Sequence, residues 1–141
     1  MTTITKVKTG SKFEEHASYS RVVAVDNWIL VSNTAGRNPD TKEIPDDVSE
    51  QLKQVFANIE RGLSAVDSDL SDVVSARIFI QNPADTETVM TLFGETMRGV
   101  DPVITVTCPP LGAEVYKVEL EVTAYRGAGN AETIRIDTSA Q

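Results

Sequence analysis

Hydrophobic and polar residues alternate in short runs along much of the chain, and two longer stretches have a helical spacing instead. The short runs predict strands at residues 4–8, 21–25, 28–32, 72–80, 103–107 and 115–126. Asp26 and Asn27 separate the second run from the third, which predicts a hairpin. Segments 9–20 and 33–45 are interrupted by polar residues, Gly or Pro, so we expect loops there.

Each helical stretch follows a proline. After Pro45, Asp46 or Asp47 can accept hydrogen bonds from free N–H groups, and the predicted helix continues to about Val66. Its apolar residues lie mostly three or four positions apart and form one stripe: Val48, Leu52, Val55, Phe56, Ile59 and Leu63. The second predicted helix follows Pro83 and ends near Met97. Its inward residues are expected to be Val89, Leu92, Phe93 and Met97.

This order of elements predicts an α+β fold in which two helices cover one face of a mixed sheet. Two helices leave the other face without cover, so we expect self-association. Residues 1–126 are expected to form a single domain, followed by a C-terminal arm or tail at 127–141. Within that arm, "ETIRID" alternates enough to pair as an edge strand, and a disordered tail is the equal alternative.

Composition narrows the classes of function. The formal net charge is −8, and without clustered Lys and Arg the surface repels phosphate backbones, so nucleic acid is not an expected partner. One cysteine, Cys108, and one histidine, His16, indicate neither a disulfide nor a metal site, and no cofactor is expected. No run of 18 apolar residues and no signal-like N-terminus are present, so we expect a cytoplasmic protein without a membrane partner.

The last predicted strand carries a lone polar face formed by Lys117, Glu119 and Glu121. One interpretation of Glu119 is an outward residue that is solvated or paired with Lys117 or Arg126. The other is a partly desolvated carboxylate that lies in a cleft between subunits and activates water. Glu121 is expected at the surface or lining a pore.

Three segments of the chain resemble the Rid family, the YjgF-type reactive-intermediate deaminases. They are "NWILVSNTAGRNPDTKEIP", the helix "DVSEQLKQVFANIERGLSAV" with the strand "DLSDVVSARIFI", and "DPVITVTCPPLGAEVYKVELEV", within residues 18–126. The resemblance implies a chorismate-mutase-like fold and a homotrimer with a central β-barrel and ligand clefts between subunits. In family deaminases these clefts bind small enamine or imine acids and hydrolyse them to 2-keto acids and ammonia.

The resemblance also implies which residues form the site. Glu119 matches the glutamate that positions water, Tyr19 matches the loop tyrosine and Ser32 matches the serine after the second hairpin strand. Four further positions of the pocket depart from the family pattern. Where the family has a glycine, a helix asparagine, the carboxylate-binding arginine and a cysteine, this chain has Asn33, Met90, Ile104 and Val106, respectively.

Losing an arginine removes a charge-assisted contact worth about 1.5–3 kcal/mol, so a simple 2-imino acid is expected to be a poor substrate. Arg21 or Arg37 can supply a cation from another direction, although surface positions are expected for both.

Two functions remain open. One is a hydrolase of an enamine, imine or related C–N bond, and the other is a trimer that binds a metabolite or partner without turnover. The older family label of ribonuclease is disfavoured by the charge of −8.

Overall fold

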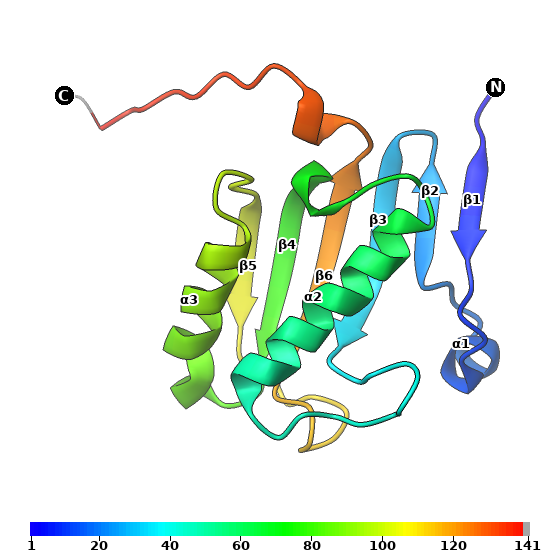
Figure 1. Ribbon diagram of the computed structural model, residues 1–141, viewed down its shortest axis with the longest axis vertical. Helices are drawn as coiled ribbons and strands as arrows, with labels where there is room; N and C mark the ends of the chain where they lie inside the picture. Colours follow the sequence, from blue (N-terminus) through cyan, green and yellow to red (C-terminus); the bar gives the residue numbers. More distant parts are fainter. Residues whose placement is uncertain (140–141) are drawn as a thin grey trace.

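The computed structural model describes residues 1–139, which form one six-stranded mixed sheet covered by helices on one face (Figure 1). The strands are β1 (Ile4–Val7), β2 (Val22–Val25), β3 (Trp28–Ala35), β4 (Val73–Ile80), β5 (Val103–Thr107) and β6 (Val118–Tyr125). They lie in the order β1-β2-β3-β6-β4-β5. Neighbours are antiparallel except for the parallel pair β4 and β5.

Two long helices, α2 (Val48–Ser64) and α3 (Thr86–Thr96), cover the same face of this sheet (Figure 1). A short helix, α1 (Lys12–Ala17), lies between β1 and β2 in the chain. Single 3₁₀ turns are formed by η1 (Leu70–Asp72), η2 (Pro83–Asp85) and η3 (Ala128–Asn130). The predicted α+β arrangement is therefore confirmed.

The core lies between the two long helices and the strands behind them. Asp46 and Asp47 are the two predicted caps of α2. Asp47 forms the cap, because it accepts a hydrogen bond from the backbone N–H of Glu50 at 3.0 Å. All six apolar residues of the predicted α2 stripe are buried. On β6 the alternation is equally regular, because Val118, Leu120, Val122 and Ala124 are buried against the helices while the residues between them face the other way.

The prediction of a loop over residues 9–20 is wrong, because α1 forms within it. Ser11 caps this helix by accepting from the N–H of Phe13, and Glu14 is buried. The six-residue helix has no apolar stripe, so hydrophobic periodicity gives no signal for it. It is held instead by polar contacts with distant residues, which no local pattern reveals.

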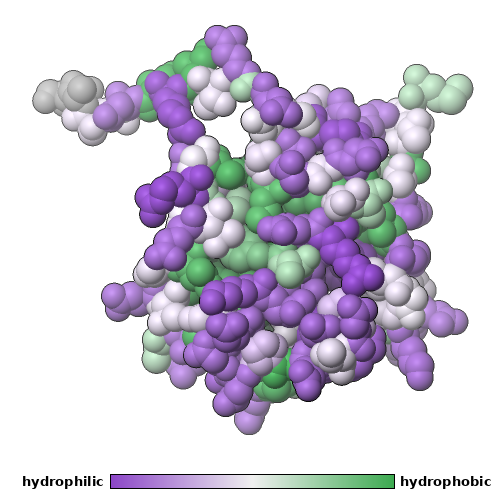
Figure 2. Space-filling model, in the orientation of Figure 1, coloured by the Kyte–Doolittle hydropathy of each residue, from purple (hydrophilic) through white to green (hydrophobic). Residues whose placement is uncertain are grey.

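The second face of the sheet, which we call the open face, is covered by no helix within residues 1–139. Trp28 and Leu30 of β3 and Val103 of β5 are 50%, 49% and 70% exposed there. Figure 2 shows the opposite side, where the outer surfaces of the helices are largely hydrophilic. No helix within residues 1–139 is both long enough and apolar enough to cross a membrane.

The C-terminal arm extends away from the sheet beyond η3 (Figure 1). Residues 131–139 do not join a sheet, so the "ETIRID" segment is not paired as an edge strand within this chain. Arg135 fastens the arm by an ion pair of 2.7 Å with Asp101 just before β5. Ile134 and Ile136 on either side of it are exposed, and apolar colour follows the arm in Figure 2.

Candidate functional site

Glu119 lies on the open face near the start of β6, between β3 and β4. It is paired with Ala35 of β3 and Phe79 of β4, and its side chain is half-buried. Neither Lys117 nor Arg126, the two cations predicted as possible partners of Glu119, contacts it. Lys117 forms an ion pair of 3.8 Å with Asp46, and the guanidinium of Arg126 donates to the carbonyl oxygens of Asp26 and Val66. Glu119 is therefore held by a different partner.

That partner is Asn33, whose side-chain amide donates to Glu119 Oε1 at 2.6 Å. A β-bulge makes this contact possible. Val31 pairs with Val122 and Thr34 pairs with Leu120, so β3 uses one residue more than β6 over this stretch. Strict alternation after the buried Val31 would turn Asn33 towards the helices, whereas the extra residue turns it to the open face and buries Thr34 instead.

Burial raises the pKa of Glu119 above its ordinary value of 4.5, and the hydrogen bond from Asn33 opposes this effect without cancelling it. The carboxyl group therefore holds its proton to a higher pH than an exposed glutamate does. A higher pKa makes this carboxylate a better proton acceptor than an exposed glutamate, and its protonated form can later return the proton to a reacting group.

Replacing Asn33 with Ala should raise the pKa of Glu119 further, because the amide stabilises the ionised carboxylate more than the neutral acid. A ¹³C NMR titration of labelled glutamate carboxyl groups measures this change, with the Glu119 signal assigned from its absence in Glu119→Gln. Asn38→Ala is a suitable control, because it also removes an asparagine amide, but one whose Oδ1 accepts from the Asp40 N–H within the loop after β3. A fall in the pKa in Asn33→Ala would contradict the contact seen here.

Ser32 lies next to the bulge, and both Ser32 and Tyr19 use polar atoms to join segments of the chain. Ser32 Oγ donates to the carbonyl oxygen of Ser20 at 2.7 Å, and the N–H of Ser32 donates to the carbonyl oxygen of Arg21. The carbonyl oxygen of Tyr19 accepts from Lys8 Nζ at 2.6 Å. These bonds hold the Tyr19 loop against the strand that carries Asn33.

Ile104, Val106 and Met90 are not brought to Glu119 within one chain. Ile104 and Val106 pair with the buried Ala76 and Ile78, so they lie on the helix side of the edge strand β5. Met90 belongs to α3 and packs partly buried against the core. The sheet separates all three from the open face on which Glu119 lies.

On the open face, Phe79 and Thr107 lie level with Glu119. Phe79 pairs with Glu119 on one side and with Thr107 on the other. Neither residue could be selected from the sequence, because counting positions along the chain does not reveal the register between β5 and β4. Strand alternation could have placed Phe79 on the open face, but its level beside Glu119 depends on pairing between distant segments.

The two arginines predicted as possible replacement cations differ in their contacts. Arg21 Nη1 donates to the carbonyl oxygen of Asn33 at 3.1 Å and to Thr34 Oγ1 at 3.3 Å, and its Nε lies 3.9 Å from Glu14. Arg37 Nε donates to the carbonyl oxygen of Lys42 at 3.4 Å in the loop after β3. Arg21 lies beside the bulge, but its charge is already matched by a buried carboxylate.

Two shallow concavities in the described part of the chain lie away from Glu119. One is between α2 and α3, beside Lys53 and Glu95, and the other is bordered by Asp72 and Arg126.

Within residues 1–139, His, Cys, Asp and Glu side chains do not gather in groups of three that could hold a metal ion. Cys108 is exposed, with its sulfur 3.9 Å from Thr86 Oγ1.

Comparison with known proteins gives the family. The family model described as endoribonuclease L-PSP matches residues 9–126, which is most of the chain. The chain belongs to the YjgF/Rid family. This YjgF/Rid protein is 31% identical over 127 residues to the protein HMF1 of Saccharomyces cerevisiae, covering 88% of this chain and 96% of HMF1. It is 30% identical over 113 residues to the 2-iminobutanoate/2-iminopropanoate deaminase of Bos taurus, covering 77% and 80% of the two chains.

Solved structures of YjgF/Rid proteins share the fold. A member from Mycobacterium tuberculosis superposes with a TM-score of 0.79 at 28% identity, covering 87% of this chain and 99% of its own. The YjgF gene product of Escherichia coli superposes with a TM-score of 0.72 at 25% identity, covering 77% and 87%. The resemblance inferred from the sequence is thus confirmed at the level of the family, and the mixed sheet with its helices matches structures of that family.

Proposed function

We propose that this YjgF/Rid protein is a small-molecule hydrolase of an enamine, an imine or a related C–N bond. The observation that carries the proposal is Glu119, a half-buried carboxyl group with a raised pKa, which Asn33 holds on the open face. A similar protein, from Bos taurus, is named as a deaminase of 2-iminobutanoate and 2-iminopropanoate, which supports the substrate class. Ser32 and Tyr19, beside the bulge, border the ligand in this proposal.

In the proposed reaction water adds to the carbon of a C=N bond. A new C–O bond forms, the π electrons move to nitrogen, and the Glu119 carboxylate accepts a proton from the attacking water. The protonated carboxyl group then returns this proton to nitrogen. This gives a carbinolamine. Its hydroxyl group then loses a proton to the Glu119 carboxylate, which passes the proton to nitrogen as the C–N bond breaks, so ammonia leaves and the carbon becomes a carbonyl group. The raised pKa of Glu119 suits a group that must both accept and donate a proton.

An assay of ammonia release tests the proposal. An amino acid oxidase generates imines in the cuvette, and the rate is compared with spontaneous hydrolysis over a panel of acidic and neutral side chains. Because Ile104 stands at the carboxylate-binding position of the family pattern, we expect weak use of simple 2-imino acids. Rates at background for the whole panel would remove the enzymatic claim.

Binding without turnover is the second candidate function. It is supported by the pairing of Arg21 with Glu14, which leaves that cation unavailable to hold a substrate carboxylate. An imine panel at background, beside a metabolite that raises the melting temperature, would favour this candidate. The same metabolite should then protect the Glu119 carboxyl signal from titration if it occupies the proposed site.

We further propose a homotrimer in which the open faces line a central β-barrel and neighbouring subunits complete the clefts. Exposed apolar residues on that face, Trp28, Leu30 and Val103, support an interface there. In this trimer, Ile104 and Val106 on the edge strand β5 of one subunit border the cleft of a neighbouring subunit. Light scattering should give three times the 15.3 kDa subunit mass, and Leu30→Asp should reduce it to that of the subunit. A subunit mass for the unaltered protein would contradict the assembly.

A cytoplasmic location is part of the same proposal. One similar protein, MMF1 of Saccharomyces cerevisiae, is named as mitochondrial. Fractionation of the source cells, followed by detection with an antibody against this chain, distinguishes the two compartments.

A further inference from the structure

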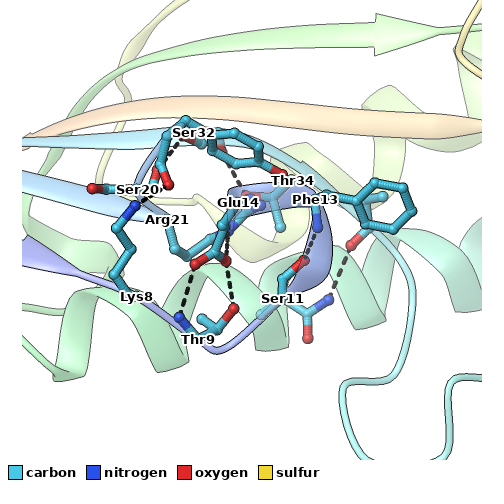
Figure 3. Close-up of polar contacts among 12 residues, drawn as sticks. Lys8, Thr9, Ser11, Phe13, Glu14, Ser20, Arg21, Ser32 and Thr34 are labelled. Atoms are coloured by element: carbon cyan, nitrogen blue, oxygen red, sulfur yellow. Dashed lines mark hydrogen bonds and ion pairs between the residues drawn. The ribbon is translucent and has the colours of Figure 1, made fainter. Parts of the chain in front are cut away.

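A buried carboxylate lies at the N-terminal end of the fold, remote in sequence from Glu119. Glu14 is only 2% exposed, although it belongs to the six-residue helix α1. It accepts from the backbone N–H of Thr9 at 2.9 Å and from the Thr9 hydroxyl, and Arg21 Nε lies 3.9 Å away (Figure 3). Burying a charge is costly unless it is paired and hydrogen-bonded, so Glu14 and Arg21 stabilise each other in place.

Arg21 uses the other end of its guanidinium group to hold the bulge of β3. Nη1 donates to the carbonyl oxygen of Asn33 and to the hydroxyl of Thr34, the two residues that follow Ser32. Figure 3 shows Arg21 beside Ser32 and Thr34. A bulge interrupts the regular ladder of hydrogen bonds, so an external donor has most influence there. Asn33 in turn donates its side-chain amide to Glu119. The contacts therefore run without a break from Glu14 through Arg21 and Asn33 to Glu119.

We propose that Glu14 and Arg21 are positioning residues, which hold the β3 bulge so that the amide of Asn33 stays directed at Glu119. The positioning role does not depend on the reaction, and only its predicted effect on kcat rests on the proposed hydrolase function. A planar guanidinium group can reach the Glu14 carboxylate, a carbonyl oxygen and a hydroxyl at once, which the ammonium of a lysine cannot do in the same geometry. Neither Glu14 nor Arg21 touches a substrate in this arrangement.

Positioning and simple electrostatics predict opposite results for Glu14→Gln. Removing the Glu14 charge leaves the Arg21 cation uncompensated, so a purely electrostatic effect lowers the pKa of Glu119. If the pair positions Asn33, the loss of the Glu14 carboxylate releases Arg21 and loosens the amide, and the pKa of Glu119 rises. The other charged groups around Glu119 are Lys117 just before β6, Glu121 of β6 and Arg77 of β4, and all of them are unchanged in this variant.

The test is a ¹³C NMR titration of the Glu119 carboxyl group in the full-length protein, which needs no substrate. We expect Glu14→Gln to raise the pKa of Glu119 in the same direction as Asn33→Ala, with no additional rise in the double variant. Glu15→Gln is the matched control, because Glu15 is the exposed neighbour on the same helix. A lowered or unchanged pKa of Glu119 in Glu14→Gln overturns the proposal.

Arg21→Lys gives an independent measurement if Glu14→Gln fails to fold, since it keeps the positive charge and loses the planar fork. It should also raise the pKa of Glu119, and an unchanged value overturns the proposal. If the protein turns over an imine, we expect both variants to lower kcat about 10-fold with KM close to wild type. A raised pKa in a protein without turnover would retain the positioning pair and reject the hydrolase, so the two failures are distinguishable.

Discussion

Glu119→Gln should lower the rate of ammonia release from a turned-over imine by about 10²- to 10⁴-fold, the usual contribution of a positioned acid–base group. A glutamine side chain has nearly the same shape and can still accept the hydrogen bond from Asn33, but it cannot accept a proton from water at neutral pH. The measurement is kcat/KM for the best imine in the panel, corrected for spontaneous hydrolysis.

The matched control is Glu121→Gln, two positions further along the same face of β6. It removes an equal charge from the same strand without touching the Asn33 contact, so its rate should stay within about threefold of wild type. Equal rates for Glu119→Gln and the unaltered protein would contradict the role of Glu119. Equal losses in the two variants would instead indicate a general effect of strand charge.

Stability provides a second check on Glu119→Gln. A carboxyl group whose folded-state pKa is raised contributes stability that is fully present below its ordinary value of 4.5 and is lost as pH rises through the folded-state value. Glu119→Gln avoids this loss, so at pH 7 it should be at least as stable as wild type. The advantage should disappear below pH 4.5. Urea denaturation at the two pH values measures it, and a gain only at low pH would have the wrong sign.

Leu120→Ala should lower the free energy of unfolding by about 2–5 kcal/mol. Leu120 follows Glu119 on β6, is 0% exposed and faces the helices in the centre of the sheet. Truncation removes apolar contacts and leaves a cavity that the strands on both sides prevent from closing. Because the whole domain is expected to be stable by only about 5–15 kcal/mol, this one change is a large fraction of the total.

Urea denaturation followed by circular dichroism measures the effect of Leu120→Ala. Val115→Ala is the control, because Val115 is an exposed apolar residue in the loop before the same strand. We expect it to change stability by less than about 0.5 kcal/mol. A cost below about 1 kcal/mol for Leu120→Ala would mean that the core around β6 can collapse into the space. It would then be a poor support for a site that needs fixed geometry.

Much of the fold could be predicted because its signals are local. The α2 stripe is buried as predicted, since residues three and four positions apart always share one side of a helix. The alternation on β6 placed Glu119 and Leu120 on opposite faces for the same kind of reason. Helix α1 was missed because its stabilising contacts, from Thr9 and Arg21 to Glu14, join residues outside the helix.

The sequence by itself determined the family, the order of the main strands and helices, and the side of the last strand on which Glu119 lies, because each depends on residue types at fixed spacing. Only the tertiary structure decided what surrounds that carboxylate. The Asn33 contact depends on a bulge, which shifts the side-chain alternation of β3 by one residue relative to β6. The placement of Ile104 on the helix side of the sheet depends on the register of β5 with β4. Register and bulges arise from pairing between distant segments, and a local pattern of hydrophobic and polar residues does not encode them.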